Sequence, residues 1–407
     1  MLGFLKKRTR KPVVYPRPEH CISRKNIDPD ALKVLYRLDS LGYTAYLVGG
    51  GVRDLLLGRK PKDFDVGTSA SPQEVRRAFR NCFLIGRRFR LAHVKFGDNI
   101  IETATFRQNS QTVGEIIEHA AEGPFEDNTF GTPETDASRR DFTVNGLFYN
   151  IRDFSVIDWV GGMKDLKRKI IRSIGDPAIR FQEDPVRMMR AIKFSSRLGF
   201  SIERKTAAAM KKYHSCIMSA AVPRVCEEVF RLFAYGHSAE AFRQMYGCGM
   251  MGDLLPDLAK FIDSDGGRSS KTFSYLKTLD GYDTMMSNKG FEVSNGLRTA
   301  TLMVAMFRKA GKDGAGRRIV QQMADTLTIP KVTYVTAVML LESLSRLSVS
   351  PKKGKQRFVH NREFLDALDF GRIVLRTEGK DECVLNEWAD LYDKMEKEKE
   401  NATKDKS

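Results

Sequence analysis

Two carboxylates with one residue between them, Asp63 and Asp65, follow a glycine-rich turn by one short connection. Acidic and apolar residues alternate in Asp63-Phe64-Asp65-Val66, so a strand here would turn both carboxylates to one face. Two neighbouring carboxylates repel each other unless a cation lies between them. Mg²⁺ is commonly shared between carboxylates and substrate phosphates. The pair therefore predicts a magnesium site for chemistry on phosphates.

The turn upstream of this pair contains Gly49, Gly50 and Gly51, between an apolar strand and a short helix. The free amides of a helix N-terminus can hold phosphate oxygens, and Arg53 would add a forked donor. A dinucleotide fingerprint is disfavoured because Asp54 stands where its last glycine is required, and no P-loop pattern occurs. An NAD-dependent oxidoreductase and a P-loop ATPase are therefore poor matches. A tight turn with Arg53 in solvent remains the alternative.

The elements that position these residues follow from the hydrophobic pattern. We predict a helix from Asp28-Pro29 to Gly42, strands at 45–48, 64–66, 82–85, 89–96 and 100–106, short helices at 52–57 and 71–80, and a mobile loop at 108–136. After about residue 175 long helical patterns replace the strands, for example at 183–198 and 223–234, and the stretch 263–295 interrupts them. The predicted class is α+β, with a mixed α/β head domain followed by an all-helical region.

The positive charge of the chain is concentrated in a few segments. Lys and Arg total 68 against 51 Asp and Glu, a net charge of +17. The surplus lies in residues 1–26, 76–95 and 351–362, and the last two segments contain no acidic residue. A clustered surplus predicts a polyanionic partner, while solvated basic faces are the alternative. We interpret Phe79, Phe83 and Phe89 of the second segment as core residues rather than stacking platforms.

Cysteine spacing and hydropathy bear on the compartment. The six cysteines form no Cys-x-x-Cys pair and the six histidines show no ligand spacing, which favours reduced thiols, a cytoplasmic location and no zinc site. No run of 18 apolar residues occurs, so we predict no membrane span. Weak attraction of the basic N-terminus to anionic lipid remains open.

Five motifs occur in a fixed order along the chain. They are Leu47–Asp54, Asp63–Asp65, Arg139–Thr143, Asp158–Asp165 and Glu183–Arg187. In this order they resemble the nucleotidyltransferase superfamily, specifically its bacterial class II branch of poly(A) polymerases and tRNA CCA-adding enzymes. Three further segments are similar to the poly(A) polymerase version, namely His20–Lys25, Ile85–His93 and Ile101–Arg107. The match covers about residues 45–235, and the C-terminal 170 residues match less distinctly.

The resemblance implies roles for individual residues. Asp63 and Asp65 would bind two Mg²⁺ ions, with Glu102 and Asp141 both qualifying as the third catalytic carboxylate. ATP, as substrate, would contact Gly49, Gly50, Arg53, Arg139, Arg140, Asp184, Arg187 and Arg190. From the basic segment 76–95 we assign Arg87, Arg88, Arg90 and Lys95 to the phosphates of an RNA 3′ end, and Arg197 extends a similar basic face on the predicted neck helix.

Asp184 and Arg187 suit a reader of nucleotide bases that needs no template. An acceptor and a donor three residues apart lie on one face of a helix. Adenine and cytosine both offer a matching amino group and ring nitrogen, whereas uracil and guanine present the opposite polarity and leave a buried group unpaired. The alternative is that Asp184 only caps the helix before Pro185.

The expected organisation is a basic arm at 1–26, a nucleotidyltransferase head at 27–175, a helical neck at 176–262 that binds the nucleotide base and RNA, and a helical body with a C-terminal tail at 263–407. The expected activity is template-independent transfer of AMP from ATP to RNA 3′ ends, with release of pyrophosphate. CCA addition to tRNA is the alternative within the same chemistry. A non-catalytic RNA-binding protein is the alternative from another class.

Overall fold

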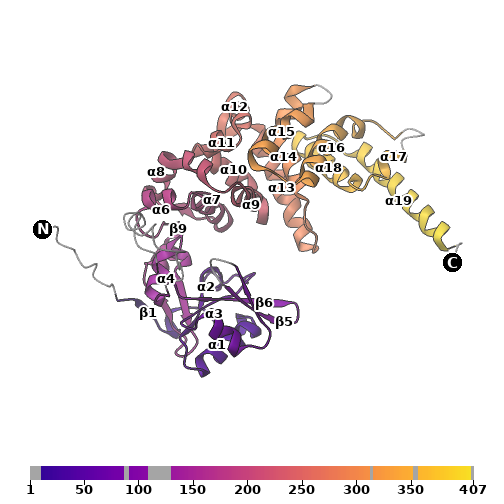
Figure 1. Ribbon diagram of the computed structural model, residues 1–407. Coiled ribbons are helices and arrows are strands. Elements are labelled where there is room, and N and C mark those ends of the chain that lie inside the picture. Colours follow the sequence, from indigo (N-terminus) through magenta and orange to yellow (C-terminus); the bar gives the residue numbers. More distant parts are fainter. Residues whose placement is uncertain (1–10, 87–90, 109–129, 312–314, 352–355, 405–407) are drawn as a thin grey trace, which may run out of the picture. The chain divides into compact units, whose positions relative to one another are not determined.

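The chain divides into a mixed unit and a helical unit. The computed structural model describes residues 11–86, 91–108, 130–311, 315–351 and 356–404. The compact units are Met1–Pro177 and Ala178–Ser407. The first contains a β-sheet with flanking helices, and the second consists almost entirely of helices (Figure 1). The predicted α+β class is confirmed.

An eight-stranded sheet forms the centre of the first unit. Its strands are β1 (Val13–Tyr15), β2 (Ala45–Val48), β3 (Asp65–Thr68), β4 (Cys82–Ile85), β5 (Leu91–Phe96), β6 (Asn99–Thr105), β7 (Leu147–Asn150) and β8 (Val156–Asp158). Their order in space is β1-β8-β7-β2-β3-β6-β5-β4. β3 and β6 run parallel, and the paired strands β2 and β3 run antiparallel. A further strand, β9 (Ile170–Ile171), lies outside this sheet.

The two faces of the sheet are covered differently. The helices of the unit are α1 (Pro29–Ser40), α2 (Gly50–Leu56), α3 (Pro72–Ala78), α4 (Pro133–Arg139) and α5 (Gly162–Arg168). α1 and α3 lie together on one face (Figure 1), over buried residues such as Leu47 and Val66. On the other face Val48, Phe106 and Phe148 pack with Ala137 of α4. This second cluster fixes α4 beside β2 and β7.

Local signals explain both the predicted elements and the corrections. Asp28 accepts hydrogen bonds from the first amides of α1, as its place before Pro29 predicts. The predicted loop 108–136 is wrong at its end, because Thr132 caps α4 and the buried Ala137 anchors that helix. Its residues 109–129 lie outside the described part. Within the arm predicted at 1–26, residues Val13–Tyr15 form β1, which pairs with β8.

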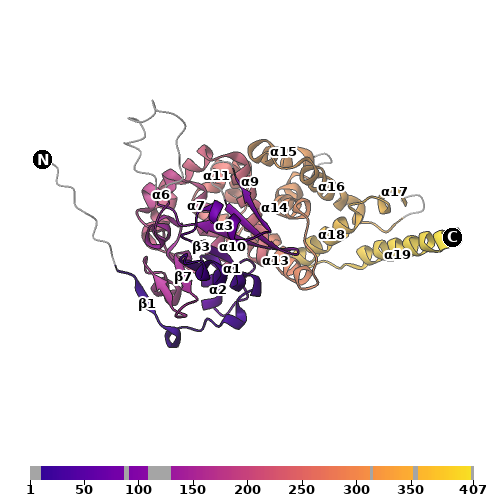
Figure 2. The same cartoon turned by 60° about the horizontal axis from the view of Figure 1, so that its bottom comes forward.

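The second unit is a succession of helices. They are α6 (Pro177–Glu183), α7 (Val186–Leu198), α8 (Arg204–Tyr213), α9 (Val222–Phe233), α10 (Ser238–Gly247), α11 (Met250–Leu254), α12 (Pro256–Ser264), α13 (Lys271–Asn288), α14 (Asn295–Ala310), α15 (Ala315–Leu327), α16 (Lys331–Leu347), α17 (Gln356–Val359), α18 (Phe364–Glu378) and α19 (Cys383–Lys404), with a short strand, β10 (Ser201–Ile202). α19 extends away from the helices before it (Figures 1 and 2). Among the described helices, none is both long and apolar enough to span a membrane.

One expectation for this unit is wrong. The stretch 263–295 does not interrupt the helices, because α13 occupies most of it. Ser270 caps the helix, and Phe273, Leu276 and Leu279 are buried along it. The glycines and serines that suggested an interruption stand before the cap and after the last turn. Local composition therefore marked the ends of a helix rather than a long connection.

Candidate active site

The end of β2, the start of β3 and the turn into α2 come together in the first unit. Val48, the last residue of β2, pairs with Asp65, the first residue of β3. Gly49 follows at once with a φ of +73°, a conformation that side-chain-bearing residues rarely adopt. A Cβ atom at Gly49 would lie 2.7 Å from Nη1 of Arg140 and 3.9 Å from Oδ2 of Asp65. The missing side chain lets the turn approach both charged groups.

Three carboxylates interact at this point. Burial and, to a smaller extent, the charges of Glu102 and Asp63 raise the pKa of Asp65 to about 6, while Arg140 opposes them. β3 begins at Asp65 rather than at Phe64, so Asp63 lies in the segment before the strand and is exposed. Such an excess of negative charge favours a bound cation.

Asp63 and Asp65 fit a metal ion whose remaining ligands are water molecules and substrate phosphates. Within the described residues no group of three or more His, Cys, Asp or Glu side chains forms a ready-made metal site. Mg²⁺ is usually held by one or two carboxylates together with water and substrate phosphates. Asp65 and Asp63 match that requirement, because their mutual repulsion falls when a cation binds.

Arg140, the residue after α4, borders the turn. Arg140 donates to Oδ2 of Asp136 through Nε and Nη2, at 3.1 and 3.0 Å, and its guanidinium lies 5.1 Å from the ring centre of Phe148. Arg139 donates to the other oxygen of Asp136 at 3.4 Å. Asp136, which the motifs did not single out, therefore orients both predicted arginines.

Arg53 is held inside the unit. Its side chain is only 2% exposed, and its guanidinium contacts the carboxylate of Asp54 at 2.8 Å. Nη2 of Arg53 would lie 3.6 Å from a Cβ atom at Gly50, so the guanidinium packs directly against the glycine turn. The alternative of Arg53 in solvent is wrong. The amide of Gly49 donates to the carbonyl of Leu147, so among the turn amides this one is already used.

Asn145 connects Arg53 with Asp141. Its side-chain oxygen accepts from Nη1 of Arg53 at 2.6 Å, and its amide donates to Oδ1 of Asp141 at 3.0 Å. The same oxygen of Asp141 accepts from the amide of Phe142 at 2.8 Å. Our predicted set omits Asn145, although it stands two residues after the Arg139–Thr143 motif. Its polar type within a buried stretch was the available signal.

The predicted base reader lies in the second unit, at the start of α7. Oδ2 of Asp184 accepts from Arg224 at 3.1 Å and lies 3.8 Å from Nε of Arg187. Oδ1 of Asp184 is buried and has no hydrogen-bond partner among the described residues. Pro185 occupies the N-cap of α7 and no side chain caps that helix, so Asp184 is not its cap.

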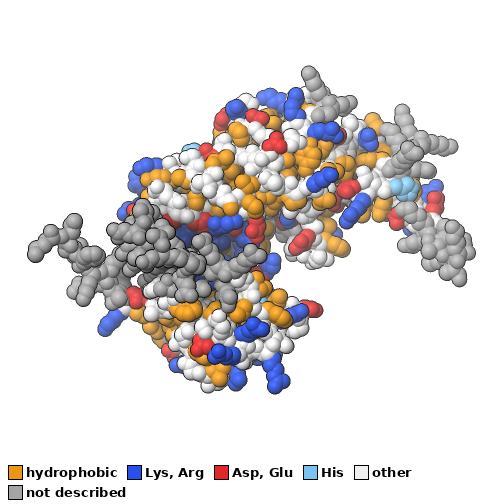
Figure 3. All heavy atoms as spheres, in the orientation of Figure 1, with side chains coloured by type: hydrophobic (Ala, Val, Ile, Leu, Met, Phe, Trp, Pro, Cys, Tyr) orange, Lys and Arg blue, Asp and Glu red, His pale blue; other side chains and the backbone are white. Residues whose placement is uncertain are grey.

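The remaining predicted cations are spread over both units. Arg190 lies 3.9 Å from Glu228, and the guanidinium of Arg197 lies 4.3 Å from the ring centre of Tyr235. Lys95 is exposed on β5. Arg87, Arg88 and Arg90 lie outside the described residues. On the face seen in Figure 3, Lys and Arg side chains are scattered over the surface, and Asp and Glu side chains are interspersed among them.

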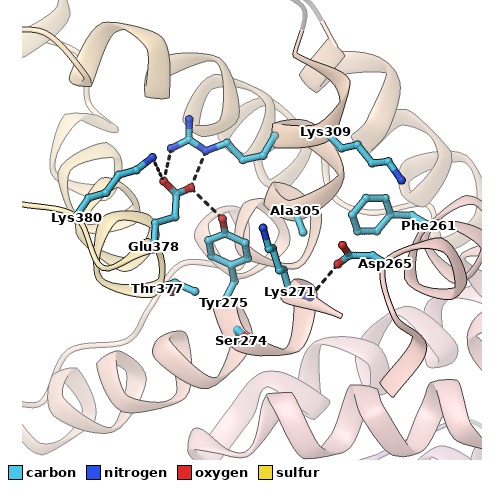
Figure 4. Close-up of a pocket in the computed structure, with 11 residues that line it drawn as sticks. Phe261, Asp265, Lys271, Ser274, Tyr275, Ala305, Lys309, Thr377, Glu378 and Lys380 are labelled. Atoms are coloured by element: carbon cyan, nitrogen blue, oxygen red, sulfur yellow. Dashed lines mark hydrogen bonds and ion pairs between the residues drawn. The ribbon is translucent and has the colours of Figure 1, made fainter. Parts of the chain in front are cut away.

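A separate cavity of about 810 Å³ lies in the second unit, among α12, α13, α14 and α18 (Figure 4). Glu378 accepts there from Tyr275 at 2.9 Å and from Arg308 and Lys380 at 2.9 and 2.6 Å. Asp265 accepts from the amide of Lys271 at 2.8 Å. Both carboxylates are already paired with donors, so this cavity lacks the uncompensated negative charge of the site around Asp65.

Segments of both units are similar to known protein families. A model described as "Poly A polymerase head domain" matches residues 45–172, and one described as "Probable RNA and SrmB- binding site of polymerase A" matches residues 199–262. Poly(A) polymerase I of Salmonella typhi is 48% identical over 280 residues, which are 68% of this chain and 60% of that protein. Poly(A) polymerase I of Escherichia coli O6:H1 is 43% identical over 302 residues, 72% of this chain and 63% of that protein.

The fold has a solved counterpart. The CCA-adding enzyme of Bacillus stearothermophilus, determined in complex with CTP, matches with a TM-score of 0.68 and 25% identity over 90% of this chain and 82% of that chain. The chain spans less than two thirds of the length of the curated relatives named above. The predicted resemblance is confirmed: residues 45–172 match the head domain of poly(A) polymerases, and the relatives and the solved structure that are similar to this chain are poly(A) polymerases and CCA-adding enzymes, which are nucleotidyltransferases.

Proposed function

We propose that this protein transfers AMP from ATP to the 3′-hydroxyl of RNA without a template and releases pyrophosphate. The observation that carries the proposal is the close approach of Gly49 to Asp65 and Arg140, which sets a glycine turn beside a carboxylate cluster and a cation. Phosphoryl-type transfer needs little beyond positioning and charge neutralisation. The similarity to poly(A) polymerases over about two thirds of this chain favours AMP as the transferred group.

The chain's own residues divide the work. Asp63 and Asp65 would hold two Mg²⁺ ions, which when bound supply charge for the triphosphate and lower the pKa of the attacking hydroxyl. Arg139 and Arg140, oriented by Asp136, face the phosphates, and Gly50 offers a main-chain amide at the start of α2. Arg53 acts mainly by packing against the glycine turn and keeping it in place.

Two carboxylates remain candidates for the third acidic group. Glu102 already influences the charge of Asp65, which favours Glu102 beside the metals. Asp141 accepts from Asn145 and from the amide of Phe142, an arrangement that suits positioning of the nucleotide ribose. We therefore assign Glu102 to the metal region and Asp141 to nucleotide positioning.

Adenine selection is assigned to Asp184 and Arg187. The buried Oδ1 of Asp184 lacks a donor within the described residues, and the amino group of adenine is a donor of the required kind. Arg187 would donate to the ring nitrogen, and Arg190 would stand near the nucleotide. Cytosine offers the same polarity, so this pair alone does not separate ATP from CTP.

RNA would contact cationic side chains. Lys95 on β5 and Arg197 on α7 are assigned to RNA phosphates, together with Arg87, Arg88 and Arg90. Such contacts predict binding that weakens steeply with salt. A location in the cytoplasm, where RNA and ATP are both available, completes the proposal.

The decisive experiment substitutes Asp63→Ala and measures AMP incorporation into an RNA oligonucleotide with Mg²⁺ and ATP. We expect transfer to fall by at least about 10³-fold, because removal of one ligand disrupts charge neutralisation in the transition state. Asp98→Ala is the matched control, since Asp98 is also an exposed acidic residue of this unit but lies in a turn. Unchanged transfer by Asp63→Ala would refute the assignment.

CCA addition is the second candidate, since a solved relative is a CCA-adding enzyme bound to CTP. A tRNA lacking its terminal CCA, incubated with CTP alone, distinguishes the two activities. We expect slow or no incorporation, and rapid addition of two cytidines would replace our proposal by CCA addition. Absence of transfer from either nucleotide, with RNA binding retained, would favour a non-catalytic RNA-binding protein.

A further inference from the structure

One row of side chains runs across the sheet from Asp65 to its edge. β3 and β6 are parallel with Val66 opposite Thr103, which sets Asp65 level with Glu102. Glu102 pairs with His93 of β5, and His93 pairs with Phe83 of β4. β4 is the last strand of the sheet. Paired residues point to the same face, so all four side chains lie on the face that carries the proposed catalytic carboxylates.

Phe83 is exposed, contrary to the expectation of core packing. Its side chain is 60% accessible, and Ile85 and Ile100 on the same face are also exposed. The reason is register: Cys82, Val94 and Ile101 point to the opposite face and are buried. Of the other two rings in that expectation, Phe79 is half-buried and Phe89 lies outside the described residues.

We infer that Phe83 is a stacking platform for a base of the RNA substrate just upstream of its 3′ end. The inference rests on the proposed function, which sets the 3′-hydroxyl at Asp63 and Asp65. Neighbouring strands lie about 4.8 Å apart and three strand spacings separate Asp65 from Phe83, so Phe83 is about 14 Å from Asp65 along the row. Stacked nucleotides repeat at about 3.4 Å, so the ring would meet the base about four positions upstream.

RNA is the occupant that the surroundings favour. The exposed face is continuous with the carboxylates, and its other end is the free edge of the sheet, so a strand entering there leads directly to the reacting centre. Lys95 stands two residues after His93 on the same face of β5 and offers a cation for the backbone. An aromatic ring beside a cation is the usual pairing in surfaces that bind single-stranded RNA, and it accepts any base.

The test uses the full chain and RNA oligonucleotides that carry 2-aminopurine at successive positions from the 3′ end. Stacking on Phe83 is expected to quench the fluorescence most strongly at about the fourth position. Phe83→Ala should abolish that position-dependent quenching and raise the KM for RNA about tenfold, with the KM for ATP unchanged. Phe83→Trp should restore both. Phe291→Ala is the matched control, because Phe291 is 61% exposed in the second unit.

The outcomes separate this inference from the proposed function. Binding is measured without ATP, so position-dependent quenching that depends on Phe83 supports the platform even if no AMP transfer occurs. Failure of transfer with such binding retained would overturn the proposed function alone. Equal quenching and equal KM for RNA in the wild type and Phe83→Ala would overturn the platform, as would absence of RNA binding by the wild-type chain.

Discussion

The guanidinium of Arg53 and the side chain of Asn145 meet in a buried hydrogen bond of 2.6 Å, although 92 residues separate them in the sequence. Arg53 packs against the glycine turn, and the side-chain amide of Asn145 donates a hydrogen bond to Asp141. Two of the family motifs are therefore joined by a residue outside both. The turn and the proposed ribose contact share one rigid support.

Asn145→Ala is expected to destabilise the fold by about 1 to 3 kcal/mol, because the buried guanidinium loses an acceptor. Asp141 also loses the hydrogen bond from the side-chain amide of Asn145, so the KM for ATP should rise while the RNA affinity stays the same. Thermal unfolding and initial rates test this, with Asn295→Ala, near the surface of α14, as the control. Unchanged stability and an unchanged KM for ATP would show that the hydrogen bonds of Asn145 to Arg53 and Asp141 contribute to neither property.

Gly49→Ala and Gly58→Ala form a matched pair. Both glycines have positive φ, +73° and +66°, but only Gly49 has Arg140 within contact of an added Cβ atom. Gly58→Ala should cost about 1 kcal/mol from backbone strain alone and leave AMP transfer intact. Gly49→Ala should cost more and abolish transfer, because Arg140 must move. Chemical denaturation and activity assays measure both, and equal effects would contradict the close approach.

Much of this site could be predicted from the sequence because its main elements have local signals. The turn, the alternating carboxylates and the helix cap at Asp28 each depend on residues within a few positions. α4 also had a local start signal, Thr132 before Pro133, which the prediction overlooked. Its anchor, Ala137, packs against Phe106 and Phe148, which are distant in sequence, so that part could not be predicted.

Other features depend on which face of the sheet a residue occupies. Phe83 looks like a core residue in the sequence, and only its pairing with His93 shows that its side chain lies on the open face. Arg53 looks like a solvent-exposed helix residue, yet Asp54 and Asn145 compensate its burial. Strand pairing decided the environment of Phe83, and Asn145, 92 residues away in the sequence, completed that of Arg53, so a local pattern could supply at most the contact of Arg53 with the adjacent Asp54.

Asp65 is expected to titrate near pH 6 in the protein without metal or nucleotide, because burial raises its pKa from 3.8 to about 6. Below that pH the protonated carboxyl binds a cation poorly, so Mg²⁺ affinity should fall as the solution is acidified. Carboxyl-carbon NMR of aspartate-labelled protein follows the titration. Glu102→Gln should lower the midpoint, since the Glu102 charge raises this pKa, and a higher midpoint would contradict the arrangement.

Asp65→Asn should stabilise the fold at neutral pH while it abolishes AMP transfer. A carboxyl with a raised pKa in the folded state costs stability once it ionises, so the wild type loses stability as the pH rises from about 4 through about 6. The rise from 3.8 to about 6 corresponds to at most about 3 kcal/mol. Denaturant unfolding without metal at pH 7 and below pH 4 measures this. The gain should be present at pH 7 and vanish well below the ordinary pKa of 3.8, where Asp65 is protonated in both states. A variant less stable than the wild type at pH 7 would mean that Arg140 outweighs burial and repulsion together.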